Sequence, residues 1–351
     1  MRASVLHGPR RITVEERRRP SPGPHEVLIR VNSVGICGSD THYYEHGRIG
    51  RFVVEQPLIL GHEASGVIEA VGENVTGRSV GQRVSIEPGV PDLSCPQCLA
   101  GRYNLCPEMR FFATPPIDGA FTELVVVHAA FAHPVPDTIS DDAAALIEPL
   151  SVGIWACQKG GVTAGSRVLI TGAGPVGLVS LQAALAFGAQ NVYVSDVNPS
   201  RLALASELGA SQTIDPRRDS LGDLVVPPDV LLECSGFASA IVDGIRALDR
   251  AGRAVLVGMG GDEVPIPLSV VQEKELTVTG HLPLRQHMAH SHRASGIGPY
   301  RPRSAGDREL RAGSGGGGAD CRAPRYAGHQ GDRPSKCVRR TPAWLSRKLL
   351  S

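Results

Sequence analysis

A glycine-rich turn between an apolar strand and a helix is the feature that most constrains how this chain folds. The residues Gly172-Ala173-Gly174-Pro175-Val176-Gly177 directly follow the apolar run Val168-Leu169-Ile170-Thr171. Glycines at these spacings permit a tight turn and a close backbone approach, and the helix N-terminus that follows presents unpaired N–H groups to a pyrophosphate. We therefore expect a dinucleotide to bind at Gly172, Gly174, Val176 and Gly177.

An acidic residue follows this turn at the spacing that a dinucleotide site needs. Asp196 ends the next apolar strand, where a carboxylate can accept hydrogen bonds from ribose hydroxyls. A carboxylate there repels a 2′-phosphate, so NAD is favoured over NADP. Arg201 follows and could either stack on adenine or bind a phosphate.

The hydrophobic pattern divides the chain into two folded parts and a tail. Residues 1–150 contain alternating strands separated by Gly and Pro, at 26–31, 64–71 and 121–127, which is typical of an antiparallel barrel or sandwich. Residues 151–280 alternate apolar strands with amphipathic helices, which predicts an α/β, doubly wound parallel sheet. The expected strands are 167–171, 191–195, 230–234, 253–257 and 275–279, and the expected helices are 176–187, 201–208 and 238–248.

Three cysteines are grouped on a loop rich in Pro and Gly. With an aspartate before them they read Asp92-x2-Cys95-x2-Cys98-x7-Cys106. Thiolates at this spacing are typical of a structural zinc site, and a carboxylate oxygen is an acceptable but harder fourth ligand. The alternative is a metal-free loop that carries three reduced thiols.

Two short motifs link the first part to a known family. Cys37-Gly38-Ser39-Asp40-x-His42-Tyr43 and Gly61-His62-Glu63-Ala64-Ser65-Gly66 resemble the zinc-containing medium-chain dehydrogenases. Further runs of residues resemble the sorbitol dehydrogenase branch of this family; they begin at Tyr43, Gly101, Phe111 and Glu148. The resemblance covers residues 1–280 and implies a GroES-like β-barrel catalytic domain followed by a Rossmann domain.

This resemblance also implies a set of site residues and a reaction. Cys37, His62 and Glu63 would ligate a catalytic zinc, with Glu148 close to the open position. Tyr43 would hold the polyol, and Ser39 would begin a proton path to solvent. The four-cysteine structural loop of the family matches this chain except at Asp92. Zinc would acidify the substrate hydroxyl, Glu148 or the Ser39 path would remove its proton, and hydride would pass to NAD, giving a ketose.

The last part of the chain departs from this pattern. Residues 281–351 hold 14 Lys and Arg against 4 Asp and Glu, so the rest of the chain, from totals of 36 and 35, holds 22 against 31. This tail has ten Gly and no Phe, and we expect most of it to be disordered. Reading His281–His290 one base later permits Thr-Phe-Arg-Tyr-Ala-Asn-Thr-Trp-Pro, the continuation that the resemblance implies. We therefore hypothesise a frameshift after Gly280, which predicts a poorly stable and weakly active chain.

Other functions fit parts of the sequence. Threonine or butanediol oxidation would use the same fold, and a non-catalytic NAD- or zinc-binding protein would follow from an altered C-terminus. The basic tail could bind nucleic acid, but it has few aromatic residues, so we expect no nucleic-acid partner. No apolar run of about 18 residues occurs, so we expect a cytoplasmic protein without a membrane partner. The resemblance implies a homotetramer.

Overall fold

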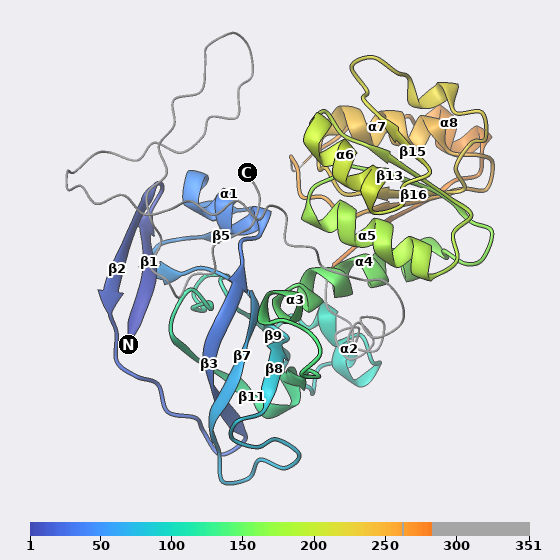
Figure 1. Cartoon of the computed structure of the whole chain (residues 1–351). Coiled ribbons are helices and arrows are strands. Elements are labelled where there is room, and N and C mark those ends of the chain that lie inside the picture. Colours follow the sequence, from blue (N-terminus) through green and yellow to red (C-terminus); the bar gives the residue numbers. More distant parts are fainter. Residues whose placement is uncertain (262, 283–351) are drawn as a thin grey trace, which may run out of the picture.

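The computed structural model describes residues 1–261 and 263–282, which form an antiparallel β part and a parallel α/β part (Figure 1). Residues 283–351 lie outside the described ones. The expected disordered tail and the hypothesised frameshift fall almost entirely on these residues. Within the described residues, no helix is long and apolar enough to cross a membrane.

The first part is built on a curled antiparallel sheet with the strand order β11-β3-β7-β8-β12. Its strands are β3 (Glu26–Gly35), β7 (Glu63–Val71), β8 (Arg83–Ile86), β11 (Leu124–His128) and β12 (Ala132–Pro134). The pairing of β3 with β7 shifts register twice, between Leu28 and Ile29 and between Val31 and Ser33. Such shifts bend a strand and redirect its side chains. Here they bring the ends of both strands, Gly35 and Glu63, opposite each other.

Smaller elements surround this sheet and close its hydrophobic core. The order β2-β1-β6 forms a three-stranded sheet, and β4 with β5 and β9 with β10 form two-stranded ones. The strands are β1 (Arg2–Gly8), β2 (Arg11–Glu16), β4 (Arg48–Ile49), β5 (Phe52–Val53), β6 (Leu58–Ile59), β9 (Gly89–Val90) and β10 (Arg110–Phe111). The helical segments are α1 (Gly38–His46), α2 (Pro96–Leu99), α3 (Asp141–Ala145), η1 (Tyr103–Leu105) and η2 (Ala129–Phe131).

The second part is a six-stranded parallel sheet with the order β15-β14-β13-β16-β17-β18, so the doubly wound fold is confirmed. Its strands are β13 (Arg167–Thr171), β14 (Asn191–Ser195), β15 (Gln212–Ile214), β16 (Val230–Glu233), β17 (Arg253–Leu256) and β18 (Thr277–Gly280). Its helical segments are α5 (Pro175–Ala186), α6 (Pro199–Glu207), α7 (Ala238–Ala247), α8 (Leu268–Glu273) and η3 (Leu221–Asp223). The sequence pattern missed β15 and α8, because both are too short to show a hydrophobic period.

The helix α4 (Ile147–Gly160) joins the two parts. It packs on α5 and β16 of the parallel sheet and also touches β7 and β8 of the antiparallel one (Figure 1). The preceding helix α3 is held to the antiparallel sheet by Ser33 and Arg83, which donate to Asp142 Oδ1 (2.6 Å) and Asp141 Oδ1 (2.8 Å). The expected boundary after residue 150 therefore lies inside a helix that contacts both sheets.

Candidate metal and cofactor sites

Three of the predicted site residues meet at one end of the curled sheet. Cys37, His62 and Glu63 each offer a ligand atom, and these atoms lie within 4.8 Å of one another. Cys37 is the N-cap of α1. Glu63 is the first residue of β7, and His62 directly precedes it. His62 is 7% exposed and Glu63 is 4% exposed. A thiol, an imidazole and a carboxyl in this arrangement fit a zinc ion that keeps an open coordination position.

A further residue, the buried Asp40, holds this group together. Its Oδ1 accepts from the Gly61 N–H at 2.8 Å, and its Oδ2 accepts from the Cys37 N–H at 3.0 Å. Oδ1 also lies 3.8 Å from His62 Nδ1. Burial alone would lower the pKa of His62, but the neighbouring Cys37 and Asp40 outweigh it and raise that pKa well above its usual value. Asp40 was not predicted to have a role, although its place three residues after the N-cap is the capping-box position.

Glu148 lies in the first turn of α4 and is 3% exposed. Burial raises the pKa of this carboxyl to about 8, with His62 opposing the rise and Glu63 adding to it. Its carboxylate does not belong to the group of ligand atoms within 4.8 Å. A carboxyl whose pKa lies near neutrality can exchange a proton with a substrate hydroxyl.

The remaining predicted catalytic residues lie on α1. Tyr43 is 3% exposed and belongs to the core of the antiparallel part, and burial raises its pKa. Ser39 is half-buried in the first turn of the same helix. The ring of Phe111 in β10 packs on His62, with 5.5 Å between the ring centroids. The roles of Tyr43 and Ser39 stay predictions.

The loop with three cysteines brings its four candidate ligands together. Asp92, Cys95, Cys98 and Cys106 offer atoms that lie within 4.8 Å of one another. Asp92 Oδ1 accepts from Cys95 N–H (3.0 Å) and Ser94 N–H (2.9 Å), and these bonds lower its pKa to about 2. The Cys98 and Asp92 N–H groups point to the sulfurs of Cys95 and Cys106, each at 3.4 Å. An ionised carboxylate beside three oriented thiols fits a closed, four-coordinate metal site.

The predicted dinucleotide turn has the geometry that its glycines suggest. Gly172 has a φ of 89°, and a β-carbon on Gly177 would lie 1.8 Å from the Gly172 carbonyl oxygen. Gly174 is the N-cap of α5, and Val176 lies in the first turn of that helix. This arrangement exposes the helix N-terminus at the carboxyl end of β13, where open parallel sheets bind nucleotides.

The predicted ribose-binding carboxylate lies next to this turn. Asp196 Oδ2 accepts from the Ala173 N–H at 2.7 Å, and Oδ1 accepts from the Asn198 N–H at 2.7 Å. Arg201 Nη1 lies 3.8 Å from Asp196 Oδ2. The carboxylate is thereby fixed in orientation before any ligand binds.

A residue that the sequence analysis did not single out organises the neighbouring turn. Glu233 ends β16, is fully buried, and accepts from the N–H groups of Ser235 (2.8 Å) and Gly236 (3.0 Å) and from the Ser235 hydroxyl. A β-carbon on Gly172 would lie 2.9 Å from Ser235 Cα, so the two turns are in contact. The signal in the sequence was the Ser-Gly pair that follows it, which is typical of a turn.

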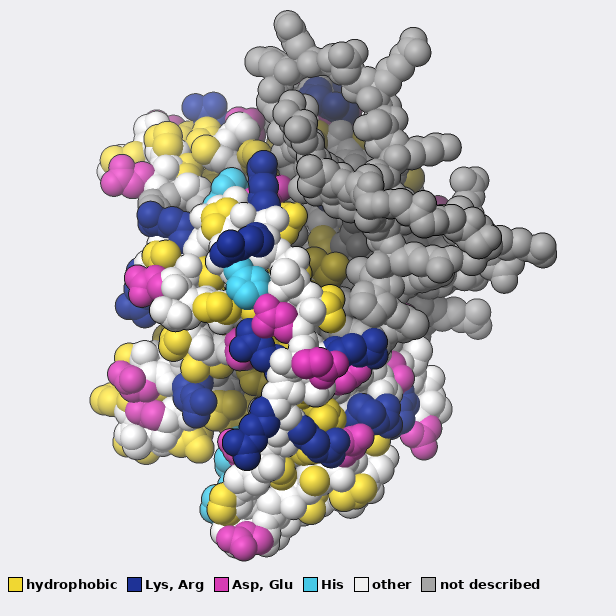
Figure 2. Space-filling view, turned by 90° about the vertical axis from the view of Figure 1, so that its left-hand side faces the viewer, with side chains coloured by type: hydrophobic (Ala, Val, Ile, Leu, Met, Phe, Trp, Pro, Cys, Tyr) yellow, Lys and Arg dark blue, Asp and Glu magenta, His cyan; other side chains and the backbone are white. Residues whose placement is uncertain are grey.

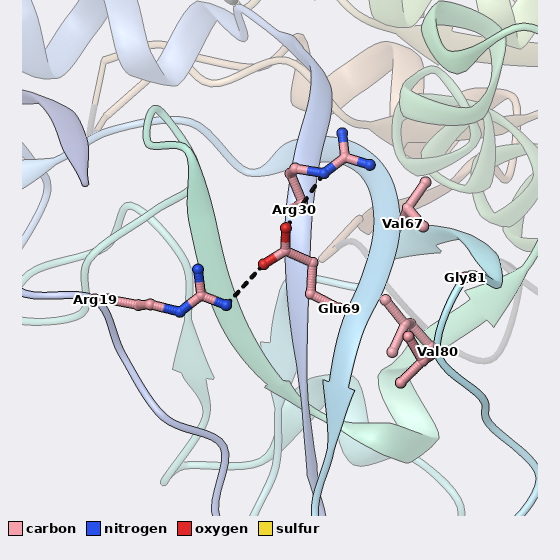
Figure 3. A pocket seen from close by; sticks show the side chains of 7 residues that line it. Arg19, Arg30, Val67, Glu69, Val80 and Gly81 are labelled. Atoms are coloured by element: carbon pink, nitrogen blue, oxygen red, sulfur yellow. Dashed lines mark hydrogen bonds and ion pairs between the residues drawn. The ribbon is translucent and has the colours of Figure 1, made fainter.

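A pocket of about 470 Å³ lies elsewhere, on the curled sheet, and contains none of these residues. Glu69 on β7 binds Arg19 at 2.9 Å and Arg30 at 3.4 Å across it (Figure 3). The face of the molecule seen in Figure 2 likewise intersperses basic with acidic side chains. The described side chains that are visible on that face therefore do not form a surface of a single charge sign.

The fold and the two clusters define a class of protein, the zinc-binding alcohol dehydrogenases. Residues 23–137 match the alcohol dehydrogenase GroES-like domain, and residues 175–290 match the zinc-binding dehydrogenase domain. Human sorbitol dehydrogenase is 46% identical over 284 residues, covering 79% of this chain and 80% of that protein, and the Macaca fascicularis enzyme is 47% identical with the same coverage. The crystal structure of L-idonate 5-dehydrogenase from Escherichia coli has a TM-score of 0.78 and 31% identity, covering 83% of this chain and 86% of that one. The chain belongs to the zinc-containing medium-chain dehydrogenases, in their sorbitol dehydrogenase branch.

Proposed function

We propose that the chain oxidises a secondary hydroxyl of a small polyol, such as sorbitol or xylitol, with NAD⁺. The products are a ketose, NADH and one proton. The observation that carries this proposal is the group formed by the half-buried Cys37 and the buried His62 and Glu63 beside Glu148, in a chain that is 46% identical to a sorbitol dehydrogenase. The identity of 46% to a sorbitol dehydrogenase favours a polyol over threonine or butanediol as the substrate.

The chain's own residues would divide the work as follows. Cys37, His62 and Glu63 would hold the zinc, which would supply a Lewis acid that lowers the pKa of the substrate hydroxyl, and NAD would supply the hydride acceptor. Either Glu148 accepts the hydroxyl proton or Ser39 begins the path that carries it to solvent. Tyr43, anchored in the core by α1, orients the polyol.

The cofactor would lie along the carboxyl ends of the parallel strands. The turn formed by Gly172, Gly174, Val176 and Gly177 holds the pyrophosphate at the N-terminus of α5. Asp196 accepts from the ribose hydroxyls, and Arg201 lies beside the adenosine.

The other assignments belong to the same proposal. Asp92, Cys95, Cys98 and Cys106 hold a second, structural zinc. Residues 1–150 form the catalytic domain and residues 151–280 the cofactor domain. The protein acts in the cytoplasm as a homotetramer, with neither a nucleic acid nor a membrane as partner.

An assay of zinc content together with NADH formation tests the proposal. The purified chain is offered sorbitol, xylitol, threonine and 2,3-butanediol, each with NAD⁺ and with NADP⁺. We expect the highest kcat/KM with a polyol and NAD⁺. The same assay on a version with the reading frame restored after Gly280 tests the expectation that the present chain is weakly active, and resequencing the DNA around the Gly280 codon tests the frameshift itself. A zinc-loaded, folded, frame-restored protein that oxidises none of the polyols would overturn the proposed function.

A further inference from the structure

A buried carboxylate that the proposed reaction does not use lies close to the cysteine loop. Glu87 follows β8 and is 2% exposed. The Tyr103 hydroxyl donates to its Oε1, and His133 Nε2 lies 2.8 Å from its Oε2. Its backbone N–H donates to the Phe131 carbonyl at 2.8 Å. Both carboxylate oxygens are therefore engaged by side chains from other segments.

Tyr103 connects this carboxylate to the proposed metal ligands. It begins η1, between Cys98 and Cys106, and its carbonyl accepts from the Cys106 N–H at 2.9 Å. Its ring meets Phe131 edge-on, with 6.3 Å between centroids and 71° between planes. The contact of the ring with Phe131 and the hydrogen bond of the hydroxyl to Glu87 thus hold the Tyr103 side chain in place. The hydrogen bond from Cys106 N–H to the Tyr103 carbonyl links the backbone that carries the Cys106 thiol to this side chain.

The proposed ligand set of the cysteine loop explains why the contacts that hold Tyr103 matter. A carboxylate is a harder ligand for zinc than a thiolate, so replacing one thiolate by Asp92 weakens the ligand set. A loop that is already ordered loses less conformational entropy when an ion binds. Affinity at such a site therefore depends strongly on what holds the loop.

We propose that Glu87 is a positioning residue for the metal site of Asp92, Cys95, Cys98 and Cys106. By holding Tyr103, it orders the loop before the ion arrives. This inference rests on the proposed metal site in that loop.

Cobalt binding tests the inference, because Co²⁺–thiolate absorbance reports the loop directly. A Cys37→Ser background removes the thiolate of the other cluster, so the remaining absorbance belongs to the loop. We expect Tyr103→Phe and Glu87→Leu each to weaken Co²⁺ binding by about tenfold or more, the range typical when residues that support metal ligands are lost. Glu87→Gln keeps an acceptor for the Tyr103 hydroxyl, so it should restore much of the affinity lost in Glu87→Leu.

A matched control variant separates the positioning role of Glu87 from a general effect on protein stability. Tyr193→Phe also removes a hydroxyl from a tyrosine that is 6% exposed, but in β14 of the other part, and it should keep the parent affinity. Parent affinity in both Tyr103→Phe and Glu87→Leu overturns the role of Glu87 and leaves the metal site standing. No cobalt–thiolate absorbance in the parent overturns the metal site, and the role of Glu87 with it. If Glu87→Leu does not fold, Tyr103→Phe decides the question.

Discussion

Gly35 and Glu63 stand opposite each other on neighbouring antiparallel strands, and a β-carbon on Gly35 would lie 2.1 Å from Glu63 Oε2. The glycine therefore leaves the space that the carboxyl of a proposed zinc ligand occupies. Because the clash involves the flexible end of a side chain, a larger residue at position 35 would move the carboxyl rather than prevent folding.

Gly35→Ala is accordingly expected to lower the affinity of the catalytic cluster for zinc by about tenfold, the lower end of what disturbed ligand support costs. Zinc retained during dialysis against a chelator measures the effect, and circular dichroism checks the fold. Gly38→Ala is the control, since a β-carbon there meets no atom within 4 Å. Equal zinc retention in both variants would contradict the prediction.

Glu148→Gln keeps the size of a buried side chain but removes its ability to accept a proton. We expect kcat for polyol oxidation to fall by about 10²-fold, the lower end of what general acid–base catalysis contributes. Zinc content and NADH binding should stay at the parent level, because Glu148 lies outside the ligand group. A kcat within twofold of the parent would exclude Glu148 as the proton acceptor.

Asp92→Cys would complete a set of four thiolates in the cysteine loop. We expect zinc at this site to become about tenfold more resistant to chelators, since thiolate is the softer ligand. The bonds from Ser94 and Cys95 to Asp92 Oδ1 would be weakened, which limits the gain. Metal analysis after timed chelator treatment makes the comparison, with Asp92→Ala expected to lose zinc faster than the parent. Faster loss from Asp92→Cys would show that the carboxylate is the better ligand here.

Asp196→Asn should weaken discrimination against NADP. The amide has nearly the same shape but no charge to repel a 2′-phosphate, and Arg201 lies nearby. We expect the ratio of kcat/KM for NAD over NADP to fall by about tenfold, or about 1.4 kcal/mol. Asp249→Asn is the control, because that carboxylate binds Arg167 at the opposite, amino-terminal end of β13. An unchanged ratio in Asp196→Asn would rule out the ribose-binding role.

His281 gives the fold a pH dependence of its own. Its Nε2 lies 3.1 Å from the Val152 carbonyl, and burial lowers its pKa to about 4. Unfolded histidine titrates near pH 6.5, so below that pH the unfolded state binds a proton that the folded state does not. The free energy of unfolding therefore falls as the pH drops from about 6.5 toward 4, by about 2 kcal/mol between pH 7 and 5.

His281→Gln should lose this component while keeping a donor for Val152. The free energy of unfolding of the metal-free parent and variant is measured with urea at pH 7 and pH 5. Any effect of protonating the metal ligands is then the same in both proteins. The parent should be destabilised more than the variant at pH 5. Parallel losses of stability in the two proteins would contradict the assignment.

Local chain geometry determined the features that could be predicted from the sequence. The dinucleotide turn and Asp196 are separated by one helix and one strand, and the cysteine loop spans fifteen residues, so their spacing alone restricts where the side chains can lie. The period of the apolar residues predicted the parallel strands within one or two positions, apart from the short β15. The family motifs named Cys37, His62 and Glu63 as one site, but the resemblance rather than the residue pattern joined them.

Only the tertiary structure decided which distant residues meet, and at what distance. The β3–β7 register places Glu63 against Gly35, Asp40 ties α1 to Gly61, and α4 brings in Glu148 from the start of another element. Glu87 and Glu233 look like ordinary surface acids in the sequence, yet both are buried and fully bonded. The partners of Glu87 come from distant segments that the burial of the whole core brings together, whereas those of Glu233 lie in the turn that directly follows it.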